Sequence, residues 1–335
     1  MGKENQLNTP DILFVAPYSN MPHFIRYQSL ALQQIKDSYD FLVLNDAPKE
    51  GVSLLSNKNA DKEIRAECTK YNALHYKVPQ FIHKSVSEGG LVPDGLPASH
   101  PSERHRATVN HFFQNYSSIL SSWGPRLPWP TAPFWRRTPK PYQIIILMDA
   151  DILIEKDINF KQILGDHDLA ARFNQHKVQQ DPSNPNQWWP PQYKHVTEPF
   201  TAKWPLPIFL MLNAKKNPNI IHQVNIGGFG GTDTGGLIHF LIEENQLNYK
   251  PLRVGAVQEE QIDIGSDSDR RIFVHFRGGS NWDGQSRNYY YEKLFRMFKK
   301  YRPTFFSELE DLNKDCDPNS LKSIDYNRSG FKWER

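Results

Sequence analysis

Residues 142–151 read Tyr-Gln-Ile-Ile-Ile-Leu-Met-Asp-Ala-Asp, and this stretch decides the class of fold that the sequence predicts. Its apolar core, residues 144–148, is continuous rather than alternating, which is typical of a central parallel strand buried on both faces. Two aspartates, Asp149 and Asp151, follow this strand directly. We therefore expect them at the carboxyl edge of the sheet, where open parallel sheets bind their ligands.

The chain before this strand alternates between short apolar segments and helical patterns. Residues 11–16, 40–44 and 74–78 are predicted strands. The predicted helices lie at residues 24–35, 59–71 and 101–120. The order strand, helix, strand, helix predicts an α/β protein with a mixed, mostly parallel central sheet flanked by helices.

The second half of the chain has a different character. Residues 181–205 are rich in Pro, Asn and Trp without any period, which predicts a long functional loop. Residues 271–275 form a short predicted strand, and residues 289–300 a predicted helix. Because no clear linker or internal repeat separates the halves, we expect a single domain over residues 1–335 whose second half is irregular.

The composition excludes several classes of protein. With 38% hydrophobic and 13% aromatic residues, the chain can build a sizeable core, which excludes a disordered protein. The 40 Lys and Arg residues against 37 Asp and Glu leave a net charge of +3, too small to indicate a nucleic-acid partner. The cysteines, Cys68 and Cys316, cannot build a disulfide framework and lack metal-ligand spacing.

The sequence also gives an expectation for localisation. The longest apolar runs, such as residues 144–148, are too short to span a membrane, and the first residues lack the apolar stretch of a signal peptide. We therefore expect a cytoplasmic protein. The predicted helix at residues 289–300 is basic and amphipathic, so it either contacts an anionic membrane peripherally or packs on the sheet with a solvated basic side.

The spacing of Asp149 and Asp151 predicts a metal site. Two carboxylates one residue apart in an extended chain point to the same side. Carboxylate oxygens are the ligands that Mg²⁺ and Mn²⁺ prefer, and such ions commonly bridge to substrate phosphates. The alternative is a solvated acidic turn.

Residues 272–282, which read Ile-Phe-Val-His-Phe-Arg-Gly-Gly-Ser-Asn-Trp, supply a third candidate ligand. The predicted strand ends in His275, whose neutral imidazole can complete the coordination of Mn²⁺. Arg277 can bind diphosphate oxygens in a fork, and Gly278 and Gly279 let backbone N–H groups approach those oxygens. The alternative for His275 is an ordinary hydrogen-bonded side chain at a strand end.

These two segments resemble those of GT-A-fold, metal-dependent glycosyltransferases. Residues 144–151 match the D-x-D motif that follows a central strand in that family. Residues 275–282 are distantly similar to the H-x-x-G-x-x-K-P-W segment of the glycogenin-like retaining enzymes, in which the His binds the metal. Asn281 stands in place of the Lys, and the Pro is missing. Donor phosphate binding would then fall to Arg277 or another basic residue, and a retaining outcome does not follow.

The resemblance implies a GT-A-like (Rossmann-like) fold and a hexosyltransferase activity. The donor would be a nucleotide-diphosphate sugar, a UDP-sugar in the first instance, and the acceptor a hydroxyl of a glycan, glycolipid or protein. Mn²⁺ or Mg²⁺ would assist departure of the nucleotide diphosphate. Residues 10–160 would bind the nucleotide sugar, residues 161–300 would bind the acceptor and complete the metal site, and residues 301–335 would form a C-terminal tail.

The resemblance also suggests roles for five other residues. Tyr18 would stack on the base and Asp46 would accept a hydrogen bond from the base or ribose, since both follow the first strands. Arg104 or Arg106, on the helix before the D-x-D strand, would reach the donor. Asp233 would position the acceptor hydroxyl or remove its proton. Each has a structural alternative: a loop residue for the first two, a solvated charge for the arginines, and a helix cap for Asp233.

Two other functions stay open. A phosphatase of the haloacid dehalogenase type also uses Asp-x-Asp after a strand, with the first Asp as nucleophile, but normally on the first strand of the chain. A non-catalytic module that binds nucleotide sugars or carbohydrates would show similar sites without turnover.

Overall fold

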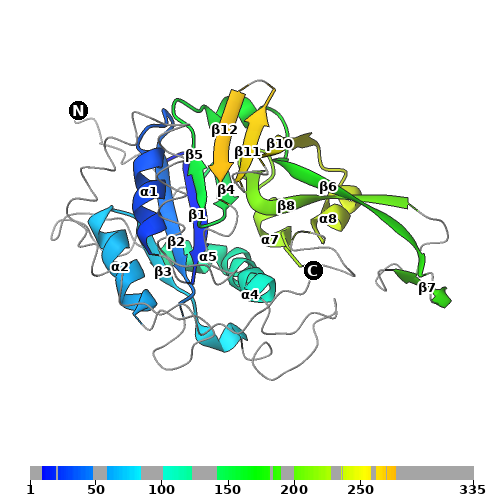
Figure 1. Ribbon diagram of the computed structural model, residues 1–335, viewed down its shortest axis with the longest axis horizontal. Helices are drawn as coiled ribbons and strands as arrows, with labels where there is room; N and C mark the ends of the chain where they lie inside the picture. Colours follow the sequence, from blue (N-terminus) through cyan, green and yellow to red (C-terminus); the bar gives the residue numbers. More distant parts are fainter. Residues whose placement is uncertain are drawn as a thin grey trace, which may run out of the picture.

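The computed structural model of the protein shows two sheets with helices packed around them (Figure 1). The structure describes residues 10–19, 22–47, 59–83, 101–122, 142–181, 184–189, 200–227, 235, 237–257, 262–268 and 270–276. No helix within these residues is long and apolar enough to cross a membrane.

The larger sheet has the strand order β3-β2-β1-β4-β8-β6-β7, with β9 beside β6. Its strands are β1 (Ile12–Tyr18), β2 (Tyr39–Asn45), β3 (Leu74–Lys77), β4 (Ile144–Met148), β6 (Leu169–Asp181), β7 (Asn184–Trp189), β8 (Phe200–Asn213) and β9 (Tyr249–Pro251). The pairings among β1 to β4, and that of β9 with β6, are parallel. The pairings of β8 with β4 and β6, and of β7 with β6, are antiparallel. This mixed sheet confirms the expected class of an α/β protein.

Alternating residues of the central strands build two cores, one on each face of the larger sheet. Phe14 and Ala16 of β1 pack in one core with helices α1 (His23–Leu32), α2 (Ala60–Lys70) and α6 (Phe160–Leu164). Leu13 and Val15 point to the other core. The helices of that core are α4 (Pro101–Gln114), α5 (Tyr116–Ser122), α7 (Ile220–Gln223) and α8 (Ile238–Glu244). A strand covered on both faces needs apolar residues at every position, which explains the continuous apolar pattern of residues 144–148.

A smaller antiparallel sheet has the order β10-β11-β12-β5. Its strands are β5 (Ile152–Ile154), β10 (Arg253–Val257), β11 (Ile262–Asp267) and β12 (Arg270–His275). Apolar residues of β5 and β12 share the core of α1. Because β5 begins immediately after Asp151, the chain passes from the larger sheet into the smaller one through the acidic turn.

The predicted helix over residues 101–120 is two helices, α4 and α5, which meet at Asn115. The side-chain amide of Asn115 donates a hydrogen bond of 2.9 Å to the carbonyl oxygen of His111. A side-chain donor that competes for a helical carbonyl weakens the regular helix at that point. Apolar spacing alone carries no sign of this competition.

The prediction of a loop over residues 181–205 is wrong in part, because β7 and the first part of β8 lie within this range. β8 runs antiparallel to β6, from the pair Val178–Phe200 to the pair Phe173–Pro205, and together they form the long ribbon in Figure 1. Pro205 lies at a register shift, where a strand tolerates the missing N–H group. Backbone pairing needs no apolar period, so these strands could not be predicted from the pattern of apolar residues. The predicted helix at residues 289–300 and the tail after it lie outside the described residues.

The smaller sheet yields a stability prediction at Gly265, which is paired with Phe273 across β11 and β12. A Cβ atom at Gly265 would overlap the buried ring of Phe273, which packs on Phe209 with ring centroids 4.6 Å apart. Gly265→Ala should therefore lower the free energy of unfolding by about 1–3 kcal/mol. Urea unfolding followed by circular dichroism measures the change.

The matched control is Gly255→Ala on β10 of the same sheet. Gly255 is exposed, and a Cβ atom there would meet no other atom within 4 Å. Its effect should stay within about 0.5 kcal/mol. Equal stabilities of the two variants would contradict the close packing of Gly265 on Phe273.

Candidate metal centre

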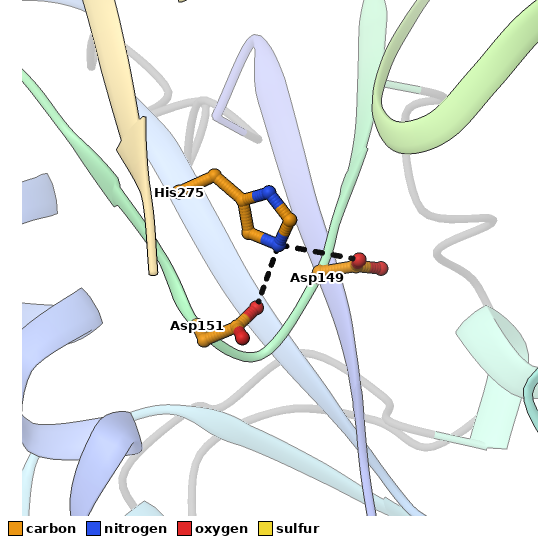
Figure 2. A group of neighbouring side chains, drawn as sticks. All are labelled: Asp149, Asp151 and His275. Carbon is orange, nitrogen blue, oxygen red and sulfur yellow. Dashed lines mark ion pairs between the residues drawn. The ribbon is translucent and has the colours of Figure 1, made fainter. Parts of the chain in front are cut away.

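Three side chains that the sequence singled out as metal ligands meet at the edge of the larger sheet (Figure 2). One ligand atom each from Asp149, Asp151 and His275 lies within 4.8 Å of the other two. The Nε2 atom of His275 is 3.3 Å from a carboxylate oxygen of Asp151 and 3.9 Å from one of Asp149. Two carboxylates and an imidazole at this spacing form a donor set for a divalent cation.

The pairing of β5 with β12 explains how His275 reaches the acidic turn. His275 lies opposite Ile152, the residue that follows Asp151. The backbone N–H of Phe276 donates to the carbonyl oxygen of Asp151 at 3.0 Å, which extends this pairing past the strand. Since the register is fixed on both sides of His275, its imidazole is held beside the two carboxylates.

The cluster also lies at the point of the larger sheet where ligands are expected. In the order β3-β2-β1-β4, the connections from β1 lead outward to β2, and the chain then returns to β4 on the other side of β1. The carboxyl ends of the strands at such a reversal are the usual ligand position in open parallel sheets. Tyr18 ends β1 and Asp149 follows β4, so both lie at this edge of the sheet.

Acidic neighbours determine the charge of His275. Burial by itself would lower its pKa, but Asp151, Asp263 and Asp149 outweigh burial and raise the pKa to about 10. The Nδ1 atom lies 3.3 Å from a carboxylate oxygen of Asp263 on β11, so that Nε2 faces the acidic pair. A carboxylate in this position orients a histidine ligand. Because a cation at Nε2 has to displace a proton, its affinity should fall at low pH.

The residues predicted at the ends of the first two strands are both buried. Tyr18 has 1% of its surface exposed, and its hydroxyl donates to Gln28 at 2.7 Å. Asp46 is also 1% exposed, and its carboxylate lies 2.8 Å from Nε of Arg104 and 2.6 Å from Nε2 of His83. In this structure the Tyr18 side chain bonds to Gln28, and that of Asp46 contacts Arg104 and His83. Contact of either with a sugar-nucleotide donor stays a prediction.

The other predicted residues are placed as follows. Arg106 is half-buried on α4. Asp233, Arg277, Gly278 and Gly279 lie outside the described residues. The structure therefore does not test the roles predicted for these four residues.

Sequence reasoning missed several polar residues around the cluster. His105 on α4 has its Nε2 atom 3.7 Å from a carboxylate oxygen of Asp149. Gln28 on α1 donates to the backbone of the acidic turn, and Asp263 contacts His275. None of the three belongs to a motif, and each comes from a different element. Their only signal in the sequence is a polar residue in a segment that is otherwise expected to be packed.

No known protein-family model matches the chain, and no curated protein is detectably similar to it. The functional argument therefore depends on the geometry of the site.

The raised pKa of His275 predicts how stability depends on pH in the metal-free protein. The pKa of an unfolded histidine is about 6.5. The stabilisation from the imidazolium is fully present below that pH and is lost as the pH rises through about 10. With a chelator present, the difference in unfolding free energy between wild type and His275→Gln should shrink over this range. Urea unfolding at about pH 6, 8 and 10 measures it, and a constant difference would contradict the charge assigned to His275.

The Asp46–Arg104 ion pair predicts a large loss of stability in Arg104→Met. The variant takes the guanidinium away from the buried carboxylate of Asp46 and leaves His83 as its close neighbour, which should cost about 2 kcal/mol or more. Arg65→Met is the control, because Arg65 is 63% exposed and lies 3.4 Å from Asp61. An exposed pair is worth roughly 0–1 kcal/mol. Thermal unfolding of both variants measures the two losses of stability. Similar losses would show that the Asp46–Arg104 pair stabilises the fold no more than an exposed ion pair does.

Proposed function

We propose that the protein is a metal-dependent glycosyltransferase, which moves a sugar from a nucleotide-diphosphate donor to a hydroxyl acceptor. The observation that carries the proposal is the meeting of Asp149, Asp151 and His275 at the carboxyl edge of β1 and β4. A cation held there would lie at the edge at which open parallel sheets bind nucleotides. The acceptor class is a hydroxyl of a glycan, glycolipid or protein, and the donor a UDP-sugar in the first instance.

The fold supports the proposal at a coarser level. The order β3-β2-β1-β4 is that of the first half of a doubly wound, nucleotide-binding sheet. The D-x-D segment follows a central strand, as the resemblance to GT-A enzymes implies. The second sheet then contributes the histidine from a distant part of the chain. We therefore assign the chain a GT-A-like (Rossmann-like) arrangement within this proposal.

The donor set fits Mn²⁺ or Mg²⁺. Oxygen ligands suit both ions, and an imidazole nitrogen favours Mn²⁺ of the two. The carboxylate of Asp149 is 24% exposed, whereas that of Asp151 is 3% exposed. The open side of the cluster therefore lies at Asp149, and the diphosphate would approach from there.

A divalent ion bound by this cluster would act as a Lewis acid that neutralises charge on the departing nucleotide diphosphate. The residues of the cluster would hold the ion in place. Asp149 and Asp151 supply the carboxylate oxygens, and Asp263 holds the ring of His275 with Nε2 toward them. Arg277, Gly278 and Gly279 follow β12 in the chain, and within the proposal they bind the phosphates of the donor. Asp233 is proposed to position the acceptor hydroxyl or remove its proton.

The proposal predicts metal-dependent binding of a nucleotide diphosphate. UDP, GDP, CDP and ADP are tested by thermal shift with Mn²⁺ and with a chelator. One nucleotide should stabilise the wild type only with Mn²⁺, by roughly 2.7 kcal/mol at about 100 times its Kd. Asp151→Asn should abolish the shift, because the amide removes one ligand charge without changing the side-chain size. The control Asp166→Asn changes an exposed aspartate outside the cluster and should retain the shift.

The same variants are then assayed for turnover with sugar nucleotides of the base identified. Asp151→Asn should lower kcat by at least about 100-fold, since the metal supplies several kcal/mol of transition-state stabilisation. Binding without turnover across a broad panel of donors and acceptors would instead support a binding module. Hydrolysis of simple phosphoesters without nucleotide binding would support a phosphatase of the haloacid dehalogenase type.

A further inference from the structure

A buried pair of polar side chains, Tyr18 and Gln28, lies against the turn that carries the two aspartates. Tyr18 ends β1, Gln28 lies on α1, and each has 1% of its surface exposed. The Tyr18 hydroxyl donates to the side-chain oxygen of Gln28 at 2.7 Å. The pair therefore links the central sheet to the helix that covers it, directly beside the acidic turn.

Both amide protons of Gln28 have an acceptor in the turn. Its Nε2 atom donates to the carbonyl oxygen of Asp149 at 2.8 Å and to that of Ile152 at 2.9 Å. The Tyr18 hydroxyl also lies 3.2 Å from the carbonyl oxygen of Ala150. A side-chain amide offers two N–H donors and one carbonyl oxygen, so the bonding capacity of Gln28 is used on both sides. Three backbone carbonyls of one short turn thus contact these two side chains.

The chemistry of the pair fixes its orientation. If the amide were reversed, its oxygen would face the carbonyl oxygens of Asp149 and Ile152. Burial, followed by the neighbouring Cys68 and the carboxylate of Asp151, raises the pKa of the Tyr18 hydroxyl well above its usual value. The hydroxyl therefore stays a donor, which is the role that the oxygen of Gln28 requires. Buried polar groups bonded in this way hold a segment in one conformation.

We propose that Tyr18 and Gln28 are positioning residues of the metal centre, which fix the backbone of residues 149–152 and so the separation of the two carboxylates. Neither side chain touches the carboxylates in the contacts described above, so the effect passes through the backbone. The inference rests on the proposed function in one respect: Asp149 and Asp151 must bind a cation. It assigns Tyr18 a role in supporting the backbone that carries Asp149 and Asp151, instead of a role in stacking on the base of a nucleotide.

The test is the affinity of the full-length protein for Mn²⁺ alone, measured by electron paramagnetic resonance of the free ion. Gln28→Met removes both donors at similar side-chain length and should weaken Mn²⁺ binding by about 10-fold or more, as for other outer partners of metal ligands. Tyr18→Phe removes only the hydroxyl and should weaken binding by a smaller factor. All proteins are compared at a temperature at which circular dichroism shows them folded.

Tyr142→Phe is the matched control. Tyr142 is also buried, and its hydroxyl donates to Asp40 at 2.6 Å, but it precedes β4, whereas the acidic turn follows that strand. The same atom is lost in a similar environment, so any general loss of stability is reproduced. Its Mn²⁺ affinity should equal that of the wild type, because no bond to the acidic turn changes.

The outcomes separate the two proposals. If Asp151→Asn binds Mn²⁺ less tightly than wild type while both Gln28→Met and Tyr18→Phe bind like Tyr142→Phe, the positioning role is overturned and the metal centre stands. If the wild type binds no Mn²⁺, the metal centre fails and the positioning role fails with it. Should Gln28→Met not fold, Tyr18→Phe against Tyr142→Phe still decides the question.

Discussion

The antiparallel pairing of β5 with β12 is the interaction on which the candidate site depends. It begins one residue after the acidic pair and places His275 opposite Ile152. Both strands also contribute fully buried residues, such as Ile152 and Phe273, to the core beneath α1. Backbone pairing and apolar packing therefore both hold β12 in place against β5. The imidazole of His275 is thereby kept beside the carboxylates.

The electrostatics of the site follow from this placement. Three carboxylates, those of Asp149, Asp151 and Asp263, lie within 4 Å of the imidazole of His275. Without a cation, the protonated imidazole supplies the compensating charge, which is why its pKa is raised to about 10. A divalent cation would supply more positive charge at the same point and release the proton. An acidic cluster of this kind is consistent with a centre that exchanges a proton for a metal.

Helices on opposite faces of the sheet reach the same edge. From α1, Gln28 bonds the backbone of the acidic turn. From α4, Arg104 binds Asp46 at the end of β2, and the next residue, His105, approaches Asp149. The Asp46–Arg104 ion pair links α4 to the end of β2, and His105 is the next residue of that helix. The carboxyl edge is thus held from both layers, as a site that keeps its geometry requires.

The central strand, the acidic pair after it and the strand that ends in His275 could all be predicted from local sequence patterns. A short local pattern was sufficient there, because burial on both faces requires a continuous apolar run. It also located Tyr18 and Asp46 at strand ends, but the tertiary structure alone decided that both are buried and bonded inward. Local patterns likewise did not predict the contacts that Gln28, His105 and Asp263 make around the acidic turn. Nor did they predict the strands within residues 181–205. These features depend on strand register and helix docking between residues far apart in the chain, whereas a local pattern records only which residues are buried.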